Sequence, residues 1–261
     1  DKENEMRFAG SNDMKKGMSV VLVLILAIPP LLAQEHSARE IVRKIDRLYR
    51  SESSYAKMEM HIVTPHWERT LLMKAWTEGT EKTFIRILEP KKEAGTATLR
   101  IGNEMWNYLP KTNKVMKIPP SMMMGSWMGS DFTNDDLVKE FSLLEDYTFE
   151  LIEPESAEEG YLYVKAVPRE GKPIIWGKQI IKVREGDYIP VREEFYDEKD
   201  NLMRVMNFKD ITTFDDRRIP AAMEMTPQDE EGNRTVLRYL EAEFNADVED
   251  DIFTLRNLRA Y

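Results

Sequence analysis

Residues 54–62 read Ser-Tyr-Ala-Lys-Met-Glu-Met-His-Ile, and this stretch determines how the rest of the chain is interpreted. Small or large apolar residues occupy every second position from Ala56 to Ile62, and Lys57, Glu59 and His61 stand between them. Alternation of this kind indicates a β-strand with one buried face, because successive side chains of a strand point to opposite faces. The sequence therefore predicts a sheet that begins here.

Similar strand signals continue along most of the chain. Thr64-Pro65-His66 turns the chain after the first strand, and Glu78-Gly79 and Gly102-Asn103 are short enough to close hairpins. Further strands are expected at residues 67–77, 82–88, 96–101, 104–109, 114–118, 147–152, 161–167, 174–184, 188–196, 202–210, 221–225 and 234–244. A sheet of about eleven or more antiparallel strands must twist and coil, so the fold class is mainly β (α+β), with one large curved sheet.

Several of these strands are apolar on both faces. In the second strand Leu71, Met73 and Ala75 alternate with Leu72 and Trp76, and in the third Phe84 and Leu88 oppose Ile85 and Ile87. A sheet with one face in water does not need this pattern. A sheet that wraps around an apolar interior and is partly covered outside does need it.

Two helices are expected to cover the concave face of this sheet. Ser37-Ala38-Arg39-Glu40 matches a capping box with Ser37 as the N-cap, and apolar residues follow at helical spacing up to Tyr49. A short helix is expected over residues 134–138, capped by Ser130-Asp131. Residues 250–258 are expected to form a short closing segment.

The N-terminal residues have the order of a secretory signal peptide. Lys15-Lys16 precedes an apolar run over residues 18–28, then Pro29-Pro30 and a small residue at Ala33. The run is shorter than the ~20 residues of a membrane-spanning helix. We expect residues 1–13 to be leader or vector-derived, residues 14–33 to be removed, and residues 34–261 to form one domain in the periplasm. The chain has no cysteine for lipidation or disulfides.

Charge and motif content argue against several classes of function. The net charge of −10 disfavours nucleic acid and anionic membrane surfaces as partners. No HExxH motif, nucleophile elbow, P-loop or Gly-rich dinucleotide turn is present. His61 and His66 could form a metal site with Glu59 or Glu68, but solvated hairpin residues are the simpler interpretation. We therefore expect no enzyme, no cofactor and no metal centre.

A methionine-rich segment is the unusual feature of the chain. Five of the 16 methionines, Met116, Met122, Met123, Met124 and Met128, lie close together beside Trp127. Thioethers suit Cu(I), but they also form adaptable apolar surfaces, and an ordinary buried loop is a third interpretation. Gly125 and Gly129 provide the backbone freedom of a lid.

Three blocks carry a resemblance to a known family: residues 104–110 (EMWNYLP), 117–120 (KIPP) and 128–137 (MGSDFTNDDL). Their order resembles the outer-membrane lipoprotein-sorting proteins, the larger relatives of the LolA carrier. The resemblance implies an open β half-barrel with helices over its concave face, a cavity for acyl chains, and association with transporters of the RND type. It also implies an arginine that holds the closed lid, for which Arg69 is the candidate by position.

These observations predict a periplasmic carrier that binds lipid or lipoprotein acyl chains, with an inner-membrane transporter as a possible partner and a monomeric state. A lipid-sensing regulatory protein on the same fold and a Met-rich metal-binding protein are the alternatives. The residues expected to line the cavity are Met58, Met60, Ile62, Met73, Phe84, Trp106, Tyr108 and Met116. Met122, Met123, Met124, Trp127 and Met128 are the expected lid, positioned by Ser130, Asp131, Phe132, Asn134 and Leu137.

Overall fold

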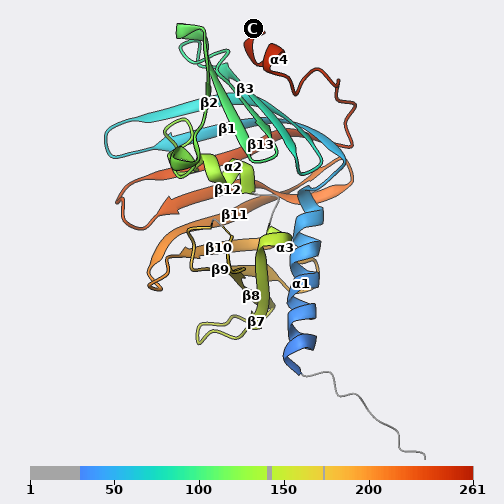
Figure 1. Cartoon of the computed structure of the whole chain (residues 1–261). Coiled ribbons are helices and arrows are strands. Elements are labelled where there is room, and N and C mark those ends of the chain that lie inside the picture. Colours follow the sequence, from blue (N-terminus) through green and yellow to red (C-terminus); the bar gives the residue numbers. More distant parts are fainter. Residues whose placement is uncertain (1–29, 140–142, 173, 261) are drawn as a thin grey trace, which may run out of the picture.

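The computed structural model describes residues 30–139, 143–172 and 174–260, and residues 14–29 of the expected signal peptide lie outside them. Within the described residues, one antiparallel sheet of 13 strands has the order β6-β5-β4-β3-β2-β1-β13-β12-β11-β10-β9-β8-β7 (Figure 1). The strands are β1 (Ser53–Val63), β2 (Glu68–Glu78), β3 (Lys82–Glu89), β4 (Ala97–Ile101), β5 (Glu104–Leu109), β6 (Lys114–Lys117), β7 (Tyr147–Ile152), β8 (Tyr161–Pro168), β9 (Lys178–Arg184), β10 (Pro190–Tyr196), β11 (Leu202–Phe214), β12 (Arg217–Pro227) and β13 (Arg234–Phe244). The helices are α1 (Pro30–Tyr49), α2 (Asn134–Lys139), α3 (Leu143–Asp146) and α4 (Leu255–Arg259), with 3-10 turns at Pro110–Thr112 and Pro120–Met122.

The sheet consists of two consecutive meanders joined in its middle. Strands β1 to β6 form one meander and β7 to β13 the other, and they meet where β1 pairs with β13. The edge strands β6 and β7 follow one another in sequence but lie at opposite ends of the sheet. The segment that connects them must therefore pass from one edge of the sheet to the other.

The expectation of a large open antiparallel sheet is confirmed, and each predicted strand corresponds to one observed strand. The main difference is the hairpin of β11 and β12, which is longer than predicted. Residues 209–213 in its tip are exposed on both faces, so they lack the alternation that marks a half-buried strand. Asp215, in the tight turn, has a φ of 51°. β9 is shorter than predicted and begins at Lys178.

Helix α1 begins at Pro30, so the prediction that Ser37 caps its N-terminus is wrong: Ser37 lies within the helix. Proline is favourable in the first turn of a helix, and the residues that follow it are compatible with helix formation. As expected, the apolar stripe of α1 packs on the sheet. Ala38, Ile41 and Val42 belong to one buried cluster with residues of β7, β8 and β9. Among the described residues, no helix has the length and apolar character needed to cross a membrane.

The two faces of the first meander bury different clusters, which explains its doubly apolar strands. Ala56, Met58, Met60 and Ile62 lie in the large cluster on the concave face. The outer face carries a second cluster, in which Phe84, Leu99 and Tyr108 pack with Phe253 and Leu258 of the C-terminal segment. That segment ends in α4, whose N-cap, Thr254, accepts a hydrogen bond from the Asn257 N–H at 3.0 Å.

Removing the Leu258 side chain tests this outer packing. Leu258 is fully buried, so Leu258→Ala is expected to lower the free energy of unfolding by ~2–5 kcal/mol through lost burial and a residual cavity. Leu255→Ala in the same helix is the control, because Leu255 is 46% exposed and should change stability by less than ~0.5 kcal/mol. Urea unfolding of both variants measures the difference. Equal effects would contradict the assigned packing.

Candidate functional site: a covered apolar cavity

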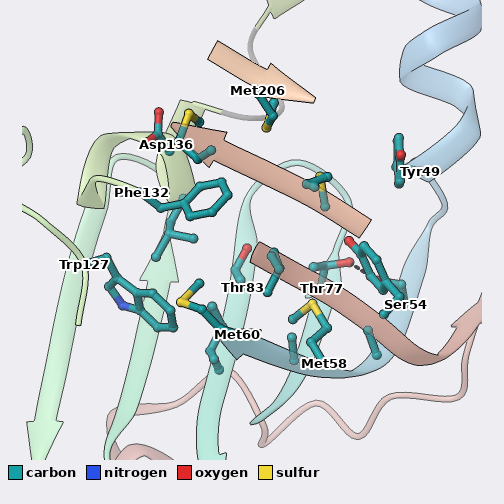
Figure 2. A pocket seen from close by; sticks show the side chains of 18 of the residues that line it. Tyr49, Ser54, Met58, Met60, Thr77, Thr83, Trp127, Phe132, Asp136 and Met206 are labelled. Carbon is teal, nitrogen blue, oxygen red and sulfur yellow. Dashed lines mark hydrogen bonds between the residues drawn. The ribbon is translucent and has the colours of Figure 1, made fainter. Parts of the chain in front are cut away.

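A cavity of about 260 Å³ lies on the concave side of the sheet. Typical ligand pockets measure ~300–1,000 Å³, so this cavity is close to the lower end of that range. Figure 2 shows Met58 and Met60 on one wall, Trp127 and Phe132 at one end, and Tyr49 and Ser54 at the other. Residues from both meanders line the cavity, so neither half of the sheet could form it alone.

The strand register explains why space remains in this place. Ala56 of β1 lies opposite Ala75 of β2, and Ala75 lies opposite Ile85 of β3. All three side chains line the cavity. Because side chains that are paired across neighbouring strands point to the same face, two alanines in register leave a hollow beside their larger neighbours. Met58 and Met73, the next inward pair, border that hollow.

The cover of the cavity is the segment between β6 and β7, which the sheet topology carries across the concave face. Trp127 is 2% exposed, and its indole N–H donates to Thr98 Oγ1 at 3.1 Å. The Trp127 backbone N–H donates to the Phe132 carbonyl at 2.8 Å, and Ser126 and Thr133 form a β-bridge. The loop is thus a compact structure that presents two aromatic side chains to the cavity.

Polar residues after Trp127 hold this loop in place. The Ser130 hydroxyl donates to the Trp127 carbonyl at 2.7 Å and accepts from the Phe132 N–H at 3.2 Å. Asp131 accepts from the Thr235 hydroxyl at 2.6 Å, which lowers its pKa, although burial is the larger effect and raises the pKa overall. Asn134 Nδ2 donates to the carbonyls of Met122 and Gly125.

The helix cap differs from the prediction that Ser130-Asp131 caps α2. Thr133 is the cap: its hydroxyl accepts from the Asp136 N–H at 3.1 Å, and the Asp136 carboxylate accepts from the Thr133 N–H at 2.7 Å. This reciprocal pair is a capping box. Ser130 and Asp131 are instead engaged with the loop backbone and with β13, which leaves the cap to the residue directly before the helix.

An ion pair between a buried guanidinium and a half-buried carboxylate joins α2 to the second meander. Arg204 of β11 donates from its two terminal nitrogens to the Asp136 carboxylate at 2.8 and 2.6 Å. The guanidinium lies 4.5 Å from the ring centre of Trp176 and 4.3 Å from that of Phe195. Aromatic faces that lie against a guanidinium shielded from water attract its positive charge, and this cation–π attraction stabilises the position of Arg204. Arg204 therefore fixes one end of the cover to the sheet.

Arg69 contacts the other end of the loop. Its guanidinium donates to the Met128 carbonyl, and a second nitrogen donates to Glu93 at 2.7 Å. Met128 and Gly129 have φ angles of 54° and 74°, so the chain makes two successive left-handed steps there. A non-glycine residue in this region costs roughly 1–2 kcal/mol, which the contacts of the loop must offset. Arg69 thus joins β2 to the backbone of the cover at Met128.

The structure brings together part of the predicted site. Met58, Met60, Met73, Trp127, Phe132 and Leu137 line the cavity. Ile62 is buried in the adjoining concave-face cluster. Among the lid methionines, Met123 and Met128 pack on that cluster, Met124 is half-buried, and Met122 is 57% exposed. In the described part of the chain, the cover therefore reaches the cavity through Trp127, Phe132 and residues of α2 such as Leu137, and its methionines are not among the lining residues.

Four predicted lining residues lie elsewhere. Phe84, Trp106 and Tyr108 belong to the outer cluster, because the concave-face cluster takes Ile85 and Ile87 from β3 and Met105 from β5. Met116 is 43% exposed on the edge strand β6. The prediction that these residues line the cavity was wrong. Both faces of β3 and β5 carry large apolar residues, so alternation alone does not show which face is inside.

The second meander supplies lining residues that were not predicted from the sequence. Its apolar lining residues include Phe195, Met206, Met223 and Met225, and Tyr147, Gln179 and Glu193 are polar lining residues. The alternation of Met223 and Met225 in β12 was a usable signal. The predicted metal-site candidates His61 and Glu68 lie on the outer part of the first hairpin, where His61 Nε2 is 3.7 Å from Glu68 Oε2. Within the described ranges, no group of three His, Cys, Asp or Glu residues is placed to hold a metal ion.

Comparisons with known proteins agree with this architecture. The structure is similar to a DUF1329 family protein from Desulfovibrio piger, with 22% identity, a TM-score of 0.79, and coverage of 86% of this chain and 99% of that one. A domain of the outer membrane lipoprotein-sorting type from Vibrio parahaemolyticus has 24% identity, a TM-score of 0.74, and coverage of 86% and 99%. A LolA superfamily protein from Nitrosomonas europaea has 21% identity, a TM-score of 0.71, and coverage of 84% and 98%.

A search of curated proteins finds none that matches the chain. A family model described as "Uncharacterized protein" matches residues 79–260, which is well over half of the chain. The chain therefore belongs to the family that this model describes, and its open sheet is the fold of the LolA-like outer-membrane lipoprotein-sorting proteins.

Proposed function

We propose that this protein is a periplasmic carrier that binds the acyl chains of a lipid or lipoprotein in its cavity. The observation that carries the proposal is the combination of an apolar hollow with an aromatic cover that closes over it. Met58, Met73 and Met206 provide adaptable walls, because methionine repacks around ligands of different shape. Trp127 and Phe132 form the end of the cover that faces the ligand.

The energetics are adequate for reversible binding. Burial of an acyl chain contributes ~0.8 kcal/mol per methylene. About ten buried methylenes would contribute ~8 kcal/mol, which corresponds to roughly micromolar affinity before the costs of ordering the ligand. A carrier needs a ligand that is held and then released, and this range permits both. Nothing in this role requires a catalytic residue.

The wider context of the proposal comes from the similar proteins. The neighbours from Vibrio parahaemolyticus and Nitrosomonas europaea are a lipoprotein-sorting-type domain and a LolA superfamily protein, and we extend a carrier role of that kind to this chain. We further infer that residues 14–33 act as the export signal and that the cargo is passed to or from an inner-membrane transporter. Removal of residues up to Ala33 would leave most of α1, from Gln34 to Tyr49, on the sheet.

The decisive test is to fill the hollow with a larger side chain. Ala75→Phe places a ring between Ala56 and Ile85, so it is expected to weaken binding of the neutral apolar probe N-phenyl-1-naphthylamine at least about tenfold, or ~1.4 kcal/mol. Fluorescence titration measures the affinity, and mass spectrometry of a solvent extract of the unmodified protein identifies co-purified lipid. Ala56→Phe is an independent second blocking variant.

Leu240→Phe is the matched control, because Leu240 is 42% exposed on β13 and is not a lining residue. It should leave probe affinity unchanged. Thermal unfolding of all three variants shows whether they are folded. If both folded blocking variants bind the probe like the unmodified protein, the cavity is not the binding site and the carrier proposal fails.

A further inference from the structure

Three hydroxyl side chains form a row across the first three strands of the sheet. Ser54 of β1 lies opposite Thr77 of β2, and Thr77 lies opposite Thr83 of β3. Side chains that are paired across neighbouring strands point to the same face with their Cβ atoms about 4.5–5.5 Å apart, so the three form one continuous polar strip. All three line the cavity (Figure 2), and we call them the hydroxyl row.

The hydroxyl row borders the apolar hollow. The next inward-facing residues of the same strands are Ala56, Ala75 and Ile85, which lie opposite one another in the same way. Met58 and Met73 follow beyond them. Successive side chains on one face of a strand are roughly 7 Å apart, so the polar and apolar parts of this wall occupy separate rows. A ligand that matches this order has a polar group at the start of an apolar chain.

Burial increases along the hydroxyl row. Ser54 and Thr77 are half-buried, whereas Thr83 is 8% exposed. Ser54 Oγ and Thr77 Oγ1 share a hydrogen bond of 2.6 Å, which uses only one of their two hydroxyl hydrogens. Thr83 Oγ1 is buried and has no hydrogen-bond partner among the described residues. The row therefore leads from half-buried hydroxyls to a buried O–H group that lacks an acceptor.

Sheet packing alone does not account for this last hydroxyl. Threonine is common in strands, and hydroxyl pairs across strands stabilise a sheet, as Ser54 and Thr77 do. A buried hydroxyl without a partner instead lowers stability, because it has lost its hydrogen bonds with water. A ligand oxygen that accepts from Thr83 restores such a bond. The carbonyl oxygen of an acyl group is an acceptor of this kind, and it stands at the start of the chain, where the order of the rows requires it.

We propose that the hydroxyl row binds the acyl linkage of the cargo, and that Thr83 Oγ1 donates to the carbonyl oxygen of an ester or amide. The hydrogen that the Ser54–Thr77 pair does not use internally provides a second donor beside it. The chain beyond the carbonyl lies over Ala56 and Ala75. The inference rests on the proposed carrier function, and it specifies the group of the cargo that the cavity recognises.

Three uncharged ligands that differ in one group test this recognition. They are 1-decanoylglycerol, an ester, its ether analogue 1-O-decylglycerol, and its amide analogue N-decanoyl-3-amino-1,2-propanediol. Each is titrated against bound N-phenyl-1-naphthylamine. The ester is expected to displace the probe at least about fivefold more effectively than the ether, a difference of ~1 kcal/mol. An amide as effective as the ester assigns the recognition to the acyl carbonyl in either linkage, and an amide as weak as the ether restricts it to esters.

Variants of one side chain connect the preference to Thr83. Thr83→Val replaces the hydroxyl by a methyl group and should remove the preference for the ester while leaving the affinity of the ether unchanged. Thr83→Ser keeps the hydroxyl and should keep the preference. Thr96→Val is the matched control, because Thr96 is similarly buried, at 7% exposed, but lies outside the cavity lining. It should bind all three ligands like the unmodified protein, and thermal unfolding shows that each variant is folded.

The outcomes distinguish this inference from the function on which it rests. If the ester, the amide and the ether displace the probe equally well, carbonyl recognition is overturned and the carrier function stands. If none of the three displaces the probe, both proposals fail. A folded Thr83→Val variant that retains the full preference for the ester overturns the role assigned to Thr83.

Discussion

Asp136→Ala is expected to lower the free energy of unfolding by about 3–5 kcal/mol, because it leaves the buried guanidinium of Arg204 without its counter-ion. The Arg204 side chain is only 6% exposed, and both of its terminal nitrogens are bonded to Asp136. The variant also removes half of the capping box at Thr133. Chemical unfolding followed by circular dichroism measures the loss.

Two further variants identify the cause. Asp136→Leu combined with Arg204→Met replaces the ion pair by apolar groups and should recover much of the stability, since a buried charge is no longer left alone. Glu241→Ala breaks the exposed pair with Lys57 and should cost no more than about 1 kcal/mol. A double variant as unstable as Asp136→Ala would show that the pair is not the source of the effect.

Trp127→Ala is expected to cost about 3–5 kcal/mol and to open the cavity to solvent. The substitution removes a large, fully buried side chain and leaves a void between the loop and the sheet. It also removes the indole N–H that donates a hydrogen bond to Thr98 Oγ1. Urea unfolding measures the stability, and the rate at which N-phenyl-1-naphthylamine dissociates measures the loss of the cover.

Met122→Ala is the control within the same loop, because Met122 is 57% exposed and outside the cavity lining. Its stability and probe dissociation should remain close to those of the unmodified protein. If Trp127→Ala releases the probe no faster than Met122→Ala does, Trp127 packs in the loop without closing the cavity.

The strand pattern could be predicted from the sequence because a half-buried antiparallel strand leaves a period of two. That signal was strong at Ala56, Met58 and Met60, whose alternate neighbours are polar. It vanished at the tip of the β11–β12 hairpin, where Ile211 is 37% exposed and no buried face exists. Helix α1 was placed correctly on the sheet, but its start was not, since a cap motif at Ser37 is also compatible with a helix interior.

The cavity was harder to predict because it depends on contacts that are distant in sequence. Arg204 and Asp136 are separated by 68 positions, and no local pattern connects them. The sequence did not show which of the two apolar faces of β3 and β5 is the inner one. In the structure, the C-terminal segment with α4 covers the outer face. Gln179 carried no sequence signal, because its place in the lining depends on how β9 packs in the folded sheet.

The pairing of β1 with β13 has a consequence for how the chain acquires its structure. Ser53 donates a hydrogen bond of 2.6 Å to the carbonyl of Ala246, which lies 193 positions further along. Loops of that length close slowly, and high contact order is associated with slow folding. Until the last strand has been synthesised, β1 presents an unpaired edge that can associate with another molecule. Completion of this sheet is therefore expected to wait until β13 has been synthesised.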